Sequence, residues 1–193
     1  DALPISVPMK FLDALDARLS GNGSVALVSA FSIPFVFVAE LLGIAVLFAL
    51  PIAVSIPVIL VVVALVEEVA KSLHVLAGFE KGRFASSLPA TLAVGAASGV
   101  GFFAGEKATA VIQLVGLPDL AVGRAAFAPA GTVGVGALPV ALALLAAPLV
   151  LHVVTASLSA LGARKGFRWY LVGLGAAILV HTAYNLAVVT LLG

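Results

Sequence analysis

The sequence contains no cysteine and little charge. Asp, Glu, Lys and Arg make up 10% of its 193 residues, whereas a soluble globular domain carries about 25%. Without cysteine the chain has no disulfide, no thiolate nucleophile and no Cys-ligated zinc site. Nine acidic and ten basic residues are too few to cover a water-exposed surface, and nucleic-acid binders show a basic patch. These absences exclude an ordinary soluble domain, a disordered protein and a nucleic-acid-binding protein.

Hydrophobic residues are abundant instead, at 63% of the chain. A helix that crosses a bilayer needs about 20 apolar residues, and five ranges satisfy this requirement: 25–49, 52–77, 88–114, 138–162 and 169–192. We therefore expect an all-α, polytopic membrane protein whose residues 1–193 form a single transmembrane helical domain.

The first 20 residues have a different pattern. Residues 8–19 place Leu12, Leu15 and Leu19 on one helical face, which predicts an amphipathic helix lying in the membrane interface. A solvated lead-in helix is the alternative. The chain begins at Asp1 without the sequence pattern of a signal peptide, so we expect none there.

Basic residues in the short loops predict the orientation. Cytoplasmic loops of membrane proteins are enriched in Lys and Arg, and two loops on the same side carry Lys81, Arg83, Arg164, Lys165 and Arg168. The opposite loops carry a single Arg124. We therefore expect an integral protein of the cell membrane with a cytoplasmic N-terminus and an outside C-terminus.

Several ionisable side chains lie within the predicted spans, where each is costly and is therefore a candidate functional residue. They are Glu40, Glu67, Glu68, Lys71, His74, Glu106, Lys107, His152 and His181, and Asn185 joins them as a strongly polar group. Glu40 has no local partner, so we expect Lys71 or Lys107 to reach it from another helix.

Glu67 and Glu68 are adjacent in the second span. Two neighbouring carboxylates in a low-dielectric setting do not both ionise readily, and such a carboxyl can act as a general base toward water. Lys71 follows Glu67 at i,i+4 and can pair with it, and His74 continues the same helical face. The alternative interpretation is a buried ion-pair cluster that only holds helices together.

The two later histidines lie in different settings. His181 and Asn185 are four residues apart and share one helical face. His can ligate a metal or bind a substrate carbonyl, and Asn can orient the His or donate to an oxyanion; the pair can also simply bond between helices. His152 has no polar neighbour in sequence, so its partner must come from another helix.

Glu106 follows a run of small residues that allows close helix approach: Gly95, Gly99, Gly101 and Gly105. At a rise of about 1.5 Å per residue, Glu106 lies roughly 27 Å beyond residue 88, nearer the outer side. The same estimate places Glu67, His152 and His181 about 15–18 Å from their basic loops, at one shared level.

These groups together resemble a known set of motifs. Residues 67–71, Glu-Glu-Val-Ala-Lys, resemble the EExxK motif of the PrsW family of intramembrane proteases, within the CAAX-protease and bacteriocin-processing superfamily. Residues 102–106, Phe-Phe-Ala-Gly-Glu, are similar to its second motif, His152 to its third, and residues 181–185, His-Thr-Ala-Tyr-Asn, to its fourth, HxxxN. The motifs occur in the family's order. Lys107 departs from it where Asn often follows the Glu, and many relatives have more than five spans.

The resemblance implies hydrolysis of a peptide bond in a membrane-anchored protein or peptide, with Glu67 or Glu68 activating water. In one version Glu106, His152 and His181 hold a metal such as Zn²⁺, and an open fourth position holds the water. In the other version Glu and His act as base and acid, and His181 and Asn185 stabilise the oxyanion. The chain has no HExxH helix, which excludes a zincin-type site.

Two other classes of function fit the same residues. Buried Glu and His side chains can relay protons in a proton- or ion-coupled transporter, although the sequence shows no inverted repeat. A catalytically silent membrane binding or immunity protein could also use such a fold. The ordered set of carboxylate, His and Asn residues favours the intramembrane endopeptidase.

Overall fold

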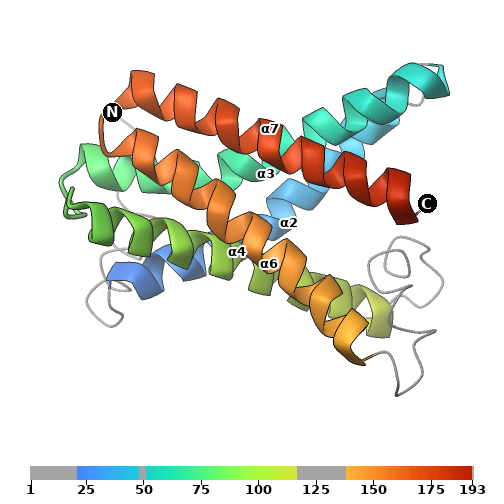
Figure 1. The fold of residues 1–193 in the computed structure, drawn as a ribbon, viewed down its shortest axis with the longest axis horizontal. Helices are drawn as coiled ribbons and strands as arrows, with labels where there is room; N and C mark the ends of the chain where they lie inside the picture. The colour runs from blue at the N-terminus through green and yellow to red at the C-terminus, as the bar shows by residue number, and fades with distance from the viewer. Residues whose placement is uncertain (1–20, 48–50, 117–137, 193) are drawn as a thin grey trace, which may run out of the picture.

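The computed structural model describes residues 21–47, 51–116 and 138–192, and every regular element in these ranges is a helix (Figure 1). The helices are α2 (Gly21–Leu47), α3 (Ile52–Glu80), α4 (Leu88–Gly116), α6 (Leu138–Ala163) and α7 (Phe167–Leu192). Each covers most of one predicted apolar range, so the all-α prediction is confirmed for the described chain. The predicted amphipathic helix at residues 8–19, like Arg124, lies outside the described residues.

Four of these helices contain segments long and apolar enough to cross a membrane: Gly21–Gly43, Leu88–Thr109, Ala146–Ala163 and Phe167–Thr190. The helix α3 is not among them. Its apolar sequence is interrupted near the middle by Glu67, Glu68 and Lys71, three charged residues within five positions. The structure therefore supports a membrane protein with at least four such helices among the described residues.

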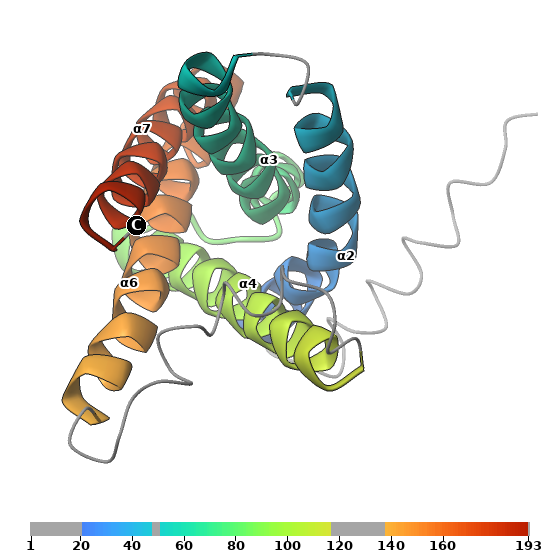
Figure 2. The ribbon, with the colours of Figure 1, turned by 90° about the vertical axis from the view of Figure 1, so that its right-hand side faces the viewer.

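Helix α4 packs against α2 on one side and α6 on the other, and it runs obliquely between them in Figure 2. Glycines make this close approach possible. A Cβ atom at Gly95 would lie 2.6 Å from Cα of Ser157, and one at Gly99 would meet the backbone of His152 on α6. Gly101 and Gly105 face the α2 backbone in the same way. The glycines of α4 thus bring α2, α4 and α6 close together around the α4 residues that follow Gly105.

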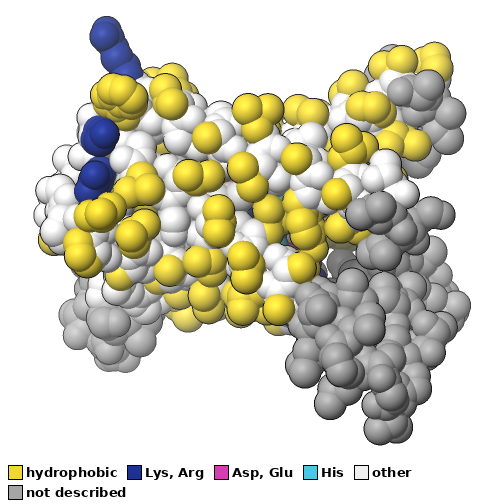
Figure 3. Space-filling model, in the orientation of Figure 1, with side chains coloured by type: hydrophobic (Ala, Val, Ile, Leu, Met, Phe, Trp, Pro, Cys, Tyr) yellow, Lys and Arg dark blue, Asp and Glu magenta, His cyan; other side chains and the backbone are white. Residues whose placement is uncertain are grey.

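The two short loops lie at the same end of the bundle, where α3 passes to α4 and α6 passes to α7 (Figure 1). We call this the basic end, because it carries Lys81, Arg83, Arg164, Lys165 and Arg168. In Figure 3, Lys and Arg gather at this end, whereas hydrophobic side chains cover the face between the ends. The opposite end, where α2, α4 and α7 finish and α3 and α6 begin, is called the far end.

Candidate functional site

Helix α3 directs two charged side chains into the centre of the bundle. Glu68 and Lys71 are both fully buried, and Nζ of Lys71 lies 2.6 Å from Oε1 of Glu68. Glu67 is partly exposed, and its Oε2 lies 3.9 Å from the same Nζ atom. The expected i,i+4 pair with Glu67 is therefore the longer contact. Glu68 has the shorter one because a fully buried carboxylate needs a close counter-charge.

His152 on α6 receives its partners from two other helices, as its sequence setting required. Its Nδ1 atom lies 2.9 Å from Nζ of Lys71, and its Nε2 atom lies 2.9 Å from Oε2 of Glu106 on α4. A charged ammonium can only donate, so Nδ1 accepts and the ring hydrogen resides on Nε2, which donates to Glu106. Lys107 donates to the other oxygen of Glu106 at 2.6 Å. Both ring nitrogens of His152 are thus engaged.

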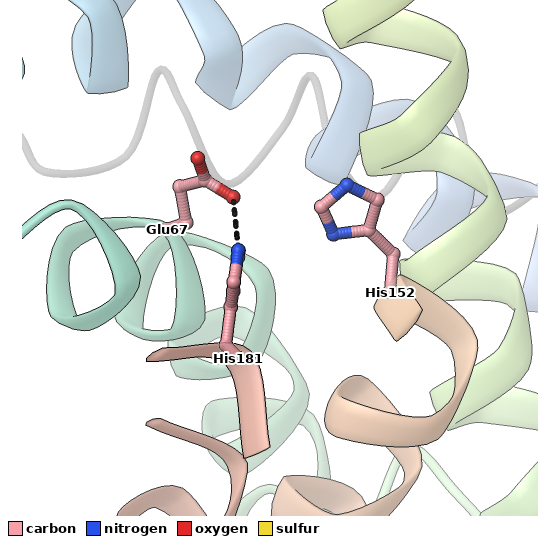
Figure 4. Close-up of side chains that lie close together, drawn as sticks. All are labelled: Glu67, His152 and His181. Carbon is pink, nitrogen blue, oxygen red and sulfur yellow. Dashed lines mark ion pairs between the residues drawn. The ribbon is translucent and has the colours of Figure 1, made fainter. Parts of the chain in front are cut away.

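His181 on α7 completes the cluster. Its Nδ1 atom lies 2.6 Å from Oε1 of Glu68, to which it donates a hydrogen bond. This tautomer leaves a lone pair on Nε2, and that atom lies 3.6 Å from Oε2 of Glu67 (Figure 4). Oε2 of Glu67 is buried and makes no hydrogen bond to any residue the structure describes. When His181 is neutral, two acceptor atoms with free lone pairs face each other.

The side chains of Glu67, His152 and His181 can hold a metal ion, because one ligand atom from each lies within 4.8 Å of the other two (Figure 4). Glu106, expected as the carboxylate ligand, is not in this group; its carboxyl contacts His152 and Lys107 instead. Carboxylates commonly orient a ligating imidazole by binding its second nitrogen. Glu106 contacts one ring nitrogen of His152 in this way, and Glu68 contacts one ring nitrogen of His181.

Three further candidates lie outside this group of ligand atoms. Asn185 is half-buried one helical turn beyond His181, toward the far end. His74 turns away from the cluster, and its Nε2 lies 3.3 Å from Oγ of Ser29 on α2.

Glu40 faces the carboxyls of Glu67 and Glu106 rather than a lysine. The expectation of a lysine partner for Glu40 is wrong, because Lys71 and Lys107 already pair with other carboxylates.

Two further residues support Lys71: Phe102, named above only as the first residue of the second motif, and Ser98, which was not singled out in the sequence. The ring of Phe102 lies beneath the ammonium group, 4.7 Å from Nζ to the ring centroid. Ser98 donates a hydrogen bond of 2.6 Å to the main-chain carbonyl of Lys71 and lies 2.6 Å from Oγ of Ser29. Ser98 and Phe102 are four residues apart on α4, so their shared helical face was the available signal.

Glu106 lies at the level of His152. The estimate from the helical rise per residue had placed it nearer the outer side of the membrane. That estimate assumed parallel helices beginning at one depth. Helix α4 crosses the bundle obliquely (Figure 2), so distance along its axis does not translate directly into depth.

The arrangement has a defined chemical capacity. Carboxyls of Glu40, Glu67, Glu68 and Glu106 surround the ammonium groups of Lys71 and Lys107, which leaves an excess of negative charge when all are ionised. The facing lone pairs of Glu67 and His181 suit a water that donates two hydrogen bonds, or a metal cation.

Comparison of the chain with protein-family models, with curated proteins and with solved structures finds no match.

Proposed function

We propose that the protein is an intramembrane endopeptidase that hydrolyses a peptide bond of a membrane-anchored protein or peptide. The observation that carries this proposal is the pair of acceptors formed by Oε2 of Glu67 and Nε2 of His181, 3.6 Å apart. Neither atom can donate to the other in this tautomer, so the pair favours a bound species that presents hydrogen atoms or positive charge. A water molecule held there would lie against a general base.

Glu67 is the better candidate for that base. Its Oε2 atom has no hydrogen-bonding partner among the described residues, and its side chain is 15% exposed. Glu68 is fully buried, and Oε1 of Glu68 already accepts hydrogen bonds from Lys71 and His181. We therefore assign water activation to Glu67 and assign to Glu68 the task of fixing the tautomer and orientation of His181.

In the proposed reaction Glu67 accepts a proton from water while the water oxygen bonds to the carbonyl carbon of the substrate. Nε2 of His181 accepts a hydrogen bond from the same water, and the side-chain amide of Asn185 donates to the negative charge that develops on the carbonyl oxygen. The carbon–nitrogen bond then breaks, and Glu67 returns the proton to the departing amine. The products are a free carboxyl and a free amino terminus, so hydrolysis consumes one water and needs no other reactant.

Zinc is the metal that a donor set of one carboxylate and two imidazoles suits, with a fourth position left for water. When bound, it would supply a Lewis acid that polarises water or the substrate carbonyl. The group of Glu67, His152 and His181 fits this donor set, and the orphaned Oε2 of Glu67 offers a free ligand atom. Nδ1 of His152 contacts Lys71, so His152 must exchange that contact to join the group.

We also propose that α3 crosses the membrane as a fifth span. Its charged residues point into the bundle rather than toward lipid, since Glu68 and Lys71 are fully buried. With five spans, the N-terminal end lies on the cytoplasmic side with the basic end, and the C-terminus lies outside, because basic loops are retained in the cytoplasm.

A proton- or ion-coupled transporter is the second candidate function. It is favoured by an unbroken series of polar contacts from Lys107 through Glu106, His152, Lys71 and Glu68 to His181. Flux across liposomes that depends on this series, without any cleavage of substrate, would support transport instead.

The endopeptidase is tested with a reporter protein that contains one transmembrane helix, incubated with the purified protein in detergent. Cleavage in isotopically labelled water yields two fragments, one of which carries the label at its new carboxyl end. Intact reporter after prolonged incubation with a panel of such helices would contradict the proposal.

A further inference from the structure

We infer that a peptide substrate enters the site from the far end of the bundle, on the membrane face opposite the basic loops, and that the entrance favours segments without acidic side chains. This inference rests on the proposed peptidase function for the identity of the substrate. The route itself follows from the distribution of buried and exposed side chains around the site.

Between the site and the basic end the interior is sealed by packed side chains. Val75 on α3, Val94 on α4 and Ala160 on α6 form one cluster that excludes solvent. Leu76 of α3, together with Tyr170 and Leu174 of α7, is buried in a second cluster. A substrate approaching from the basic end would have to separate both clusters.

On α4, α6 and α7 burial ends at the level of the site toward the far end, whereas on α3 Ala64 and Ser55 are still buried beyond it. On α4 the last buried side chain in this direction is Phe102, on α6 it is Leu151, and on α7 it is His181, among the residues whose side chains the structure describes. Beyond them lie partly exposed polar groups. Glu106 is 34% exposed and Lys107 22%, and Tyr184 and Asn185 are half-buried.

Glu106 has neighbours on three other helices. Its carboxyl contacts His152 on α6, lies near Glu40 on α2, and lies close enough to Tyr184 on α7 for an electrostatic interaction. Because other helices surround it, the solvent-accessible part of Glu106 opens along the bundle axis, toward the far end.

A lateral route is less suited to the site. A groove of about 500 Å³ lies between α2 and α3, and its lining is almost entirely apolar, with Phe35 and Leu65 at its exposed rim. None of the ionisable site residues contributes to that lining. The floor of the groove includes Val36 and Val66, which pack with buried Phe102 and separate the groove from Lys71.

The charge at the entrance determines what it accepts. Carboxyls of Glu40, Glu67 and Glu106 lie there with two ammonium groups, that of Lys71, which is already paired with Glu68, and that of Lys107, which is already paired with Glu106. A glutamate or aspartate in the substrate would meet like charge there, which disfavours its binding. Neutral or basic segments avoid this repulsion.

The chain has no cysteine, so single-cysteine variants can be labelled without background. We would introduce Tyr184→Cys or Lys107→Cys at the entrance, Lys165→Cys at the exposed basic end, and Ser159→Cys in the sealed interior. A membrane-impermeant maleimide is applied to intact cells and to permeabilised cells. We expect both entrance variants to react in intact cells, Lys165→Cys only after permeabilisation, and Ser159→Cys in neither condition.

The inferred route would be overturned if both entrance variants react only under the condition in which Lys165→Cys also reacts. It would also be overturned if neither entrance variant reacts in the folded protein. If Lys165→Cys alone reacts in intact cells and the entrance variants require permeabilisation, the route stands and the membrane orientation is reversed. Two entrance positions are used so that misfolding of one variant leaves the route testable.

The charge preference is tested on the same variant by protection. A peptide with lysines is expected to shield Tyr184→Cys from the maleimide at a concentration at least about tenfold lower than a matched peptide with glutamates. Equal protection, or better protection by the acidic peptide, would contradict the preference. Labelling and protection do not require turnover, so lack of cleavage would refute the peptidase without refuting the entry route.

Discussion

Nζ of Lys71 lies 2.6 Å from Oε1 of Glu68, and neither side chain is exposed. Removing one partner of a buried ion pair leaves an uncompensated charge, which typically costs about 3–5 kcal/mol. We expect Lys71→Met to lower the free energy of unfolding by about this amount, measured by denaturant unfolding in detergent. The matched change Lys107→Met removes a partly exposed partner of Glu106 and should cost less. Equal losses in both variants would contradict the central position of Lys71.

Zinc is expected to restore part of the stability that Lys71→Met loses. The ammonium of Lys71 contacts Nδ1 of His152 and approaches Glu67, two of the three residues that can hold a metal. A divalent cation can replace its positive charge, and a ligand that binds only the folded state raises its stability. The thermal midpoint of Lys71→Met should therefore rise with added zinc. The double variant with His181→Ala should not respond; an unchanged midpoint in Lys71→Met itself would count against zinc.

Gly99 is expected to tolerate no side chain. A Cβ atom there would overlap the backbone of His152, so Gly99→Ala must push α4 and α6 apart and displace His152 from Glu106. Overpacking of this kind costs about 1–3 kcal/mol. Gly175 on α7 is the control, because a Cβ atom there meets nothing within 4 Å. Gly175→Ala should be neutral or stabilising by up to about 1 kcal/mol. Both are compared by thermal unfolding, and similar effects would refute the packing argument.

Ser98 and Ser159 provide a second matched pair, because both are fully buried. Ser98 donates to the carbonyl of Lys71, whereas Oγ of Ser159 has no partner among the described residues. We expect Ser98→Ala to cost about 1 kcal/mol, the usual net value of such a hydrogen bond, and Ser159→Ala to cost less or to stabilise. The reverse order in denaturant unfolding would contradict the role of Ser98.

Much of the fold could be predicted from the sequence, because apolar ranges of about 20 residues separated by charged or glycine-containing loops leave few alternatives to a helical bundle. The helix α3 shows the limit of this argument. Its length is right, but Glu67, Glu68 and Lys71 make its membrane placement depend on where these side chains point, which only packing decides.

The site was predictable as a set of residues but not as a set of contacts. Helical periodicity relates Lys71 to both Glu67 and Glu68, at i+4 and i+3, and does not choose between them. The contact of Glu106 with His152 spans two helices whose crossing angle the sequence does not specify. Glu67, rather than Glu106, therefore groups with the two histidines because of tertiary geometry.

The central claim is that Glu67 activates water for hydrolysis of a peptide bond. Its most direct test is the rate of cleavage of the transmembrane reporter by Glu67→Gln, compared with wild type and with Glu80→Gln. Glu80 is exposed at the basic end of α3, so its replacement controls for the loss of one carboxylate. General base catalysis contributes about 10²–10⁴-fold, and we predict a loss of this size in Glu67→Gln with normal activity in Glu80→Gln. Undiminished cleavage by Glu67→Gln would contradict the claim.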